Sequence, residues 1–161
     1  MKLARAIHFD ESDTMVFHTP ARTGEWAISG GFEFSNWGQA DLTGKARQAF
    51  ANGWLGLETF GRVTFVAVTQ IEAAEMDALV DNLAQHFVSI YGAPSLEQAR
   101  EVALEELRQM ADMCDDQDAN TIFTVARELT DAGVSESYRI IEAAEAGLEQ
   151  FAIHGDIEGM T

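Results

Sequence analysis

The sequence predicts a single α+β domain over residues 1–161, in which a mostly antiparallel sheet of five to seven strands carries three main helices on one face. The first 70 residues are rich in Phe, Trp, Val, Thr and Gly, which are typical of strands and turns. Ala, Glu and Leu then recur at helical spacing, and strand-like residues return near the C-terminus. Because strands and helices form separate runs, the pattern favours an α+β arrangement over alternating βαβ units.

The N-terminal half is predicted to supply most of the sheet. Residues 25–29 alternate polar and apolar, and Gly30-Gly31 permits a bend before the alternation resumes at residues 32–34. A short helix over residues 42–52 is predicted to end at Gly53. The other predicted strands cover residues 4–9, 15–19, 54–59 and 62–69, the last two forming a hairpin around Phe60-Gly61.

Three longer helices are predicted next, over residues 70–91, 95–113 and 118–132. The first two begin with the spacing of a capping box, in which side chains satisfy free amides at a helix start: Thr69 with Glu72, and Ser95 with Gln98. Asp118 is predicted to cap the third helix and Gly133 to end it. Strands over residues 136–141 and 148–154 are then expected to return and pair with the N-terminal sheet, which makes one domain.

The charge is divided unevenly along the chain. The whole sequence has 27 acidic and 10 basic side chains, a formal net charge of −17. Residues 1–70 hold seven acids and six bases, so nearly all of the acidic excess lies in residues 71–161. Binding to phosphate backbones or to anionic lipid depends on Lys and Arg. We therefore expect no nucleic-acid partner and no membrane partner, and we expect a protein partner of basic character.

No motif of the sequence specifies a reaction, a metal or a cofactor. We predict no metal, no cofactor and no catalytic residue, and an enzyme stays open as the less favoured alternative. Neither a GxxxxGK[ST] nor a GxGxxG string is present. The acidic stretch 112–120 can be aligned with a calcium-binding loop that starts at Asp116. Thr121 then stands where Gly is required, and Arg127 stands where a bidentate carboxylate is required. Cys114 is the single cysteine, and its carboxylate neighbours disfavour the reactive thiolate.

The most distinctive feature is an aromatic segment punctuated by glycines. Aromatic side chains provide large, rigid contact surfaces, so this segment can line a small-molecule pocket or a partner interface. The alternative is that these rings only pack the core of the sheet. His8, His18 and His154 lie on predicted strands, which a sheet can bring together. The candidate pocket or interface residues are Trp26, Phe34, Trp37, Trp54, His8 and His18.

The expected compartment is the cytoplasm. A single cysteine allows no internal disulfide, which favours a reducing environment. The N-terminal string MKLARAIHFDESD lacks the apolar stretch of a signal peptide. The longest apolar run, residues 65–68, is far shorter than a membrane span requires.

Three strings of the first 70 residues resemble a known family. IHFDESDTMVF, GEWAISGGFEF and KARQAFANGWLGLETFGRVTFVAV are similar to a family of short uncharacterised proteins found mainly in alphaproteobacteria, and the likeness continues more loosely through the helices. The resemblance implies a domain of unknown function and assigns no site residues. It also implies a setting among accessory genes for redox enzymes and cofactor attachment.

Two classes of function are expected from the sequence. The first is a non-enzymatic accessory or adaptor protein that binds another protein, which the lack of catalytic motifs and the uneven charge favour. The alternative is a small-molecule enzyme or binding protein whose pocket lies beside the aromatic Gly-rich strands.

A homodimer is also expected, because helices on one face leave the other face and the edges of a sheet open. That second face is expected to carry aromatic side chains such as Trp26 or Phe34. Pairing through the sheet face avoids stacking two acidic helical layers, so we expect the two-fold interface there.

Overall fold

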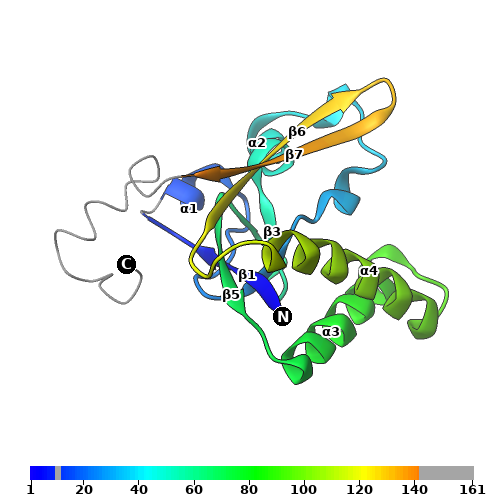
Figure 1. Ribbon diagram of the computed structural model, residues 1–161. Helices are drawn as coiled ribbons and strands as arrows, with labels where there is room; N and C mark the ends of the chain where they lie inside the picture. Colours follow the sequence, from blue (N-terminus) through cyan, green and yellow to red (C-terminus); the bar gives the residue numbers. More distant parts are fainter. Residues whose placement is uncertain (10–11, 142–161) are drawn as a thin grey trace, which may run out of the picture.

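The computed structural model describes residues 1–9 and 12–141, and it confirms the α+β class (Figure 1). Seven strands form one sheet in the order β4-β3-β2-β1-β5-β6-β7, and every neighbouring pair is antiparallel. The strands are β1 (Lys2–Ile7), β2 (Trp26–Ile28), β3 (Trp54–Gly56), β4 (Arg62–Val63), β5 (Phe65–Gln70), β6 (Ile122–Thr130) and β7 (Gly133–Ile141). The sheet therefore contains strands from both ends of the described chain, from β1 to β7.

The helices divide into one long pair and several short pieces. They are α1 (Ser12–Val16), the 3-10 helices η1 (Gly31–Phe34) and η2 (Gln39–Asp41), α2 (Gly44–Asn52), α3 (Ala73–Tyr91) and α4 (Leu96–Asp115). The long helices α3 and α4 pack against each other, and α4 also packs across β1 and β2 (Figure 1). The shorter helix α2 packs against β6 instead. Helices therefore contact the sheet in two separate places.

The strand order shows that the sheet is strongly curled. Strands β4 and β5 are separated along the chain by Thr64 alone, yet three other strands lie between them in the sheet. The sheet must therefore bend back on itself until its β4 edge comes close to β5. Pro20 reinforces this edge through a parallel bridge to Arg62. Beyond β5, the hairpin of β6 and β7 extends the sheet away from the curl (Figure 1).

The main hydrophobic core lies between the curled sheet and the α3–α4 pair. Both long helices bury one stripe of side chains at intervals of three and four residues, as an amphipathic helix does. Leu83 of α3 and Leu107 of α4 are fully buried, as are Leu3 and Val68 from the sheet. These side chains belong to one continuous cluster. The periodicity that predicts the two helices therefore also identifies their buried faces.

The predicted third helix over residues 118–132 is wrong, because this segment forms strand β6. The apolar residues that fit a helical period also fit a period of two, and Phe123, Val125 and Arg127 are buried on alternate positions. Branching at the β-carbon favours strand over helix, as at Val125. Pairing with β5 on one side and β7 on the other completes the strand. The expected helix end at Gly133 is the start of β7.

Two shorter predicted strands are also helical in the structure. Residues 15–19 were expected to be extended, but α1 occupies Ser12–Val16, and the Phe17 amide donates to the Asp13 carbonyl at 3.1 Å. Residues 32–34 lie in η1, because Gly30 adopts a left-handed conformation with φ of 71° and turns the chain out of the sheet. In both segments, local hydrogen bonds close a helical turn. An alternation of polar and apolar residues does not predict such hydrogen bonds.

The two predicted capping boxes have different outcomes. Ser95 is confirmed as the N-cap of α4, where its hydroxyl accepts from the Gln98 amide at 3.1 Å. Thr69 is part of β5, and α3 begins after Glu72, whose amide donates to the Glu75 carboxylate at 3.4 Å. The predicted strand over 148–154 lies outside the described residues.

Candidate functional site

Two buried arginines form the polar centre of the molecule. Arg62 of β4 and Arg127 of β6 are 6% and 4% exposed. Arg62 donates to the carbonyl oxygens of Gly30 at 3.0 Å and Gly53 at 3.1 Å, and its Nη2 lies 2.9 Å from Glu33 Oε1. These contacts join the β2–η1 turn to the junction between α2 and β3.

Arg127 binds the same region from the neighbouring hairpin. Its Nε donates to Glu136 at 2.5 Å, and Nη1 donates to the carbonyl oxygens of Phe50 at 3.0 Å and Gly53 at 2.8 Å. Nη2 also donates to the carbonyl oxygen of Ser29. The guanidinium groups of Arg62 and Arg127 lie 4.6 and 5.2 Å from the centre of the Phe34 ring. The two arginines therefore fix the backbone on which the neighbouring sites are built.

Burial lowers the pKa of both arginines. For Arg62 the value falls to about 10, because burial outweighs the attraction of Glu33 and the nearby Arg127 repels the charge. Burial also lowers the pKa of Arg127, and Glu136 opposes that change. At neutral pH Arg62 therefore stays charged. Each guanidinium has a carboxylate partner, as buried charges in proteins require.

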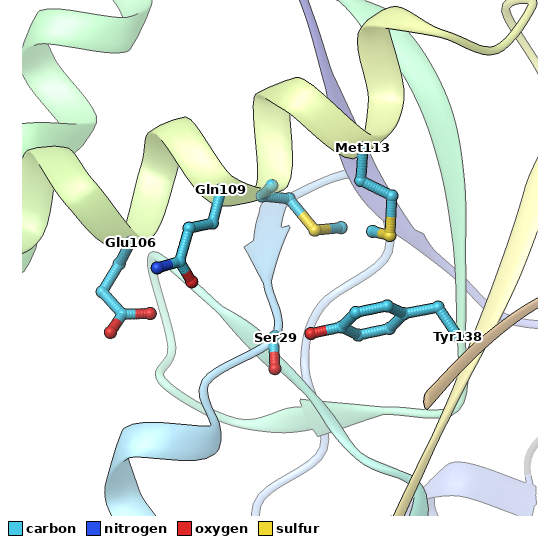
Figure 2. A pocket seen from close by; sticks show the side chains of 6 residues that line it. Ser29, Glu106, Gln109, Met113 and Tyr138 are labelled. Carbon is cyan, nitrogen blue, oxygen red and sulfur yellow. The ribbon is translucent and has the colours of Figure 1, made fainter. Parts of the chain in front are cut away.

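A groove lies between α4 and the β6–β7 hairpin (Figure 2). It consists of two adjoining hollows of about 170 and 180 Å³ that share Ser29, Glu106 and Gln109. Figure 2 shows the Glu106, Gln109 and Met113 side chains projecting from α4 into the groove, and the Tyr138 hydroxyl pointing toward Ser29 on the opposite side. We call this the α4–β7 groove; its remaining lining residues are Gly31, Phe32, Met110, Val134 and Glu136.

Glu136 is the firmly ionised group of the groove. The Ser29 hydroxyl donates to its carboxylate at 2.6 Å, the Tyr138 hydroxyl at 2.8 Å and Arg127 Nε at 2.5 Å. Burial raises the pKa of Glu136, but the hydrogen bonds from Ser29 and Arg127 outweigh burial and hold the pKa below its ordinary value. A Cβ atom at Gly31 would overlap this carboxylate, so glycine lets Glu136 lie against the backbone.

Glu106 has the opposite tendency. Burial raises its pKa, and the negative charge of Glu136 raises it further, with a smaller contribution from Glu105. Two carboxylates with pKa values displaced in opposite directions are a feature of acid–base sites. The same arrangement is suited to binding a cation, because a positive group near both carboxylates removes the repulsion.

A second hollow of about 200 Å³ opens on the other side of η1 and shares no lining residue with the α4–β7 groove. We call it the aromatic hollow. Its aromatic lining consists of Phe17, Phe34, Trp37 and Phe60. Its polar lining is His18, Thr19, Glu33, Lys45 and Arg62, and Ala46 and Ala49 of α2 complete the wall.

Three of the six candidate residues predicted from the sequence line this aromatic hollow: His18, Phe34 and Trp37. Trp26, Trp54 and His8 do not line it. Trp26 is buried, with the Arg5 guanidinium 4.0 Å from its ring centre. Trp54 is fully buried and stacks on Tyr138 at 5.7 Å, and its Nε1 has no hydrogen-bond partner among the described residues.

His8 has a local role near α1. Its Nδ1 lies 2.7 Å from Asp13, and its Nε2 lies 2.7 Å from the carbonyl oxygen of Ala21. The buried carboxylate of Asp13 also accepts from the Thr64 hydroxyl at 2.6 Å. His8 therefore ties α1 to the sheet. His154 lies outside the described residues.

The residues that form the α4–β7 groove were not among the sequence candidates. Glu106 and Glu136 are two of many carboxylates, and no spacing distinguishes them. Arg127 offered the one available signal, because a charged residue at an inward position of an apolar strand requires a buried partner. That signal becomes visible only when the segment is recognised as a strand.

Metal and thiol chemistry have little support in the described part of the chain. Within residues 1–9 and 12–141, no three His, Cys, Asp or Glu side chains are grouped closely enough to hold a metal ion. Cys114 is buried on α4, and burial, followed by the charge of Asp115, raises the pKa of its thiol to about 12. A thiol this weakly acidic is a poor nucleophile at neutral pH.

The helices in the described ranges are all too short or too polar to cross a bilayer.

Comparisons with known proteins identify one family. No curated protein and no solved structure matches the chain. A family model described as a family of unknown function (DUF6505) matches residues 1–159, which is almost the whole sequence. The domain of unknown function expected from the three N-terminal strings is therefore confirmed, and the chain belongs to the DUF6505 family.

Proposed function

We propose that the protein is a non-enzymatic accessory or adaptor protein, which binds a basic segment of another protein in the α4–β7 groove. The observation that carries the proposal is the pair of carboxylates, Glu106 and Glu136, that line this one groove and repel each other. A lysine or arginine side chain of a partner would bind between them and relieve the repulsion.

The walls of the groove suit a protein partner better than a small metabolite. Its two hollows, of about 170 and 180 Å³, adjoin each other and share Ser29, Glu106 and Gln109, so an extended peptide segment can occupy both. Met110 and Met113 provide adaptable apolar contacts for the stem of a long basic side chain. The acidic charge of residues 71–161 would attract a basic partner over a longer range.

A labelled peptide tests this proposal. Fluorescence anisotropy would follow binding of a fluorescein-labelled Lys-Val-Lys-Val-Lys peptide in low salt, with a Glu-Val-Glu-Val-Glu peptide as the reference. Glu106→Gln should weaken binding by about tenfold, the equivalent of about 1.4 kcal/mol. Glu101→Gln removes the same charge from an exposed position on the same helix and should change binding little.

Equal losses in Glu106→Gln and Glu101→Gln would contradict the groove, because they would indicate general charge attraction. Saturable binding that is unchanged in Glu106→Gln would contradict it as well.

The proposal also includes a cellular setting. It places the protein in the cytoplasm, which the single cysteine supports. It places the partner in a redox-enzyme or cofactor-attachment system of alphaproteobacteria, which the resemblance of the N-terminal strings supports.

Homodimer formation is a separate part of the proposal, and its expected surface needs correction. Trp26 and Phe34 were expected on an open sheet face, but both are buried. Arg5 covers Trp26, and Phe34 lies in η1, outside the sheet, where Phe50 and Arg62 pack on its ring. The free outer edge of β7 is a better surface, since no described strand pairs with it. Tyr138 and Ile140 of this strand are 44% and 46% exposed. An open strand edge of nine residues invites pairing with a second copy.

Light scattering at micromolar concentration tests the dimer. The expected mass is twice the 17.7 kDa of one chain, and a mass near 17.7 kDa would contradict the dimer. Ile140→Lys places a charge on the β7 edge and should give the monomer mass. Val88→Lys alters an exposed apolar residue on α3 and should leave the dimer intact. If Val88→Lys gave the monomer mass and Ile140→Lys stayed dimeric, the interface would lie on the helices and not on the β7 edge.

A small-molecule enzyme or binding protein is the second candidate function. The observation that favours it is the convergence of His18, Phe34 and Trp37 on the aromatic hollow, beside the Gly-rich segment. Saturable binding of a small aromatic compound in this hollow would support this candidate, and it would leave the groove proposal untouched.

A further inference from the structure

We propose that the aromatic hollow is a binding site for a small aromatic carboxylate, in which the ring lies among the aromatic side chains and the carboxylate meets Lys45. The inference concerns a site that is separate from the α4–β7 groove, because the two share no lining residue. It rests on the second candidate function, for which it names the class of ligand, and it does not depend on the adaptor proposal.

The rings that line the hollow come from four different segments. Phe17 follows α1, Phe34 ends η1, Trp37 lies in the next loop and Phe60 lies in the turn between β3 and β4. Phe34 and Trp37 meet edge to face, with ring centres 4.8 Å apart and planes at 87°. Aromatic rings pack well against a further planar ring in edge-to-face or offset geometry. The lining therefore selects a flat, unsaturated ligand.

Phe34 is held rigidly. The residue is 2% exposed, and its ring packs edge to face on Phe50 at 5.3 Å and lies under the guanidinium of Arg62 at 4.6 Å. A wall that is already fixed costs little ordering when a ligand binds, and such preorganisation favours affinity.

Phe60 is held in an unusual backbone conformation. Its φ of 55° is left-handed, which is uncommon for an aromatic residue. The conformation persists because Gly61 packs directly against the backbone of Thr19 and Pro20, and the Arg62 amide donates to the Thr19 carbonyl at 2.8 Å. Strained backbone of this kind is concentrated at functional positions.

The Phe60 ring is also fixed from the side of α3. It stacks on His86, with ring centres 3.7 Å apart and planes within 4° of parallel. Phe60 is therefore oriented by both its backbone and its stacking partner.

The volume of the hollow depends on two alanines of α2. Ala46 and Ala49 lie three residues apart, so they share one face of the helix, and both line the hollow. Larger side chains at these positions would fill the space. The hollow of about 200 Å³ that they leave is suited to one small ring system.

The charge of the hollow favours a monoanion. Glu33 is the single acid among the lining residues, and it lies 2.9 Å from Arg62, so these two charges balance. Lys45 is exposed at the hollow, and no ion pair joins it to another described residue. The ammonium group of Lys45 can therefore form an ion pair with one carboxylate of a ligand. This local excess of positive charge is found in a chain whose formal net charge is −17.

Isothermal titration calorimetry with indole-3-acetate tests the inference. Binding should be saturable and roughly millimolar or tighter, as expected for a ligand of about a dozen non-hydrogen atoms. Uncharged indole and the non-aromatic cyclohexaneacetate should each bind at least about tenfold more weakly, because each lacks one of the two recognised groups. Absence of saturable binding by indole-3-acetate would overturn the proposal.

Variants locate the site. Ala49→Leu should abolish binding of indole-3-acetate, because the larger side chain fills the hollow. Trp37→Leu removes a half-buried ring of the lining and should also weaken binding, which tests the site even if Ala49→Leu does not fold. Lys45→Gln should weaken indole-3-acetate by about tenfold while leaving indole unchanged. Arg47→Gln removes an equal charge from the same helix, outside the hollow, and should have no effect.

Unchanged binding in Ala49→Leu or Trp37→Leu would overturn the assignment to this hollow. Equal weakening by Lys45→Gln and Arg47→Gln would overturn the specific role of Lys45. None of these outcomes depends on the basic-peptide experiment, so the two proposals succeed or fail separately.

Discussion

At the scale of single residues, the stability of this protein depends on buried charge as well as on apolar packing. Arg62 and Arg127 donate hydrogen bonds to the carbonyl oxygens of Gly30, Gly53 and Phe50, at the turn after β2 and at the junction between α2 and β3. An apolar side chain at position 127 would remove the arginine donor from the Phe50 carbonyl, and one at position 62 would remove the arginine donor from the Gly30 carbonyl. Removing one member of an ion pair also leaves the partner charge buried without compensation. The loss of stability is then larger than the stability that the complete pair contributes.

Replacing Arg127 should therefore be strongly destabilising. Arg127→Met removes the cation beside Glu136 and should lower the free energy of unfolding by about 3 kcal/mol. This is the lower end of the range for breaking a buried ion pair, because the Glu136 side chain keeps partial access to water. Urea unfolding followed by circular dichroism would measure the change. Arg108→Met, at an exposed position of α4, should change stability by less than about 0.5 kcal/mol, and equal effects would contradict a structural role for Arg127.

Glu106 should make the stability depend on pH. Its pKa is raised chiefly by burial and then by Glu136, so the folded protein holds this proton more tightly than the unfolded chain does. The resulting stabilisation is complete below the ordinary pKa of glutamate and is lost as the pH rises through the raised value. Glu106→Gln should therefore be more stable than the parent near neutral pH, and the difference should shrink as the pH falls.

Urea unfolding between about pH 5 and pH 8 would measure this difference. Glu101→Gln, which removes the same charge from an exposed position, serves as the control. A gain in stability that is equal in the two variants, or that does not vary with pH, would contradict a raised pKa at Glu106.

At the scale of elements, the β6–β7 hairpin is the part of the fold on which the groove depends. It supplies Arg127, Glu136 and Tyr138, and its nine paired positions hold these residues in register. Thr130 and Gly133 form the closing pair, where the Thr130 hydroxyl donates to the Gly133 carbonyl at 2.8 Å. The turn therefore determines which side chains of β7 face α4.

Gly133 is the residue that this turn requires. Its φ of 118° is unfavourable for any residue with a Cβ atom, although no atom lies within 4 Å of that position. Gly133→Ala should therefore destabilise the protein by more than about 1 kcal/mol through backbone strain alone. Gly38→Ala is the matched control, because Gly38 has φ of −114° and equally open surroundings. It should stabilise by about 0.4–1 kcal/mol in thermal or urea unfolding, and equal effects would contradict the strain.

At the scale of the whole molecule, like charge opposes folding. The formal net charge is −17, and the exposed surfaces of α3 and α4 carry many of the acids. Repulsion between exposed charges extends over roughly 30 Å at 0.01 M salt and roughly 8 Å at 0.15 M. At low ionic strength, the acids of the folded protein therefore lie close enough to repel one another, and this repulsion destabilises the folded state.

Added salt should consequently stabilise the protein. Raising sodium chloride from about 0.01 to about 0.15 M should increase Tm by a few degrees, measured by circular dichroism. A variant with Glu101, Glu105 and Asp112 replaced by glutamine or asparagine should have a higher Tm at low salt and a smaller response. An equal response in the variant and its parent would show that the effect is not due to these charges.

The whole molecule also shows why some elements were predictable from sequence and others were not. Helices α3 and α4, the Ser95 cap and strand β2 follow from the sequence, because each depends on residues a few positions apart. The segment of β6 fits both periods, so its neighbours β5 and β7 decide its structure. The sites depend on still longer separations: the Ser29–Glu136 hydrogen bond joins residues 107 positions apart.

The sequence by itself therefore determined the α+β class, the long helical pair and an aromatic segment of interest. Local periodicity reports which face of an element is buried, and that is enough for these conclusions. Only the tertiary structure decided that the sheet curls, that His18, Phe34 and Trp37 share a hollow, and that Glu106 lies near Glu136. The physical reason is that periodicity carries no information on which distant surface covers a buried face, whereas a site consists of contacts between such surfaces.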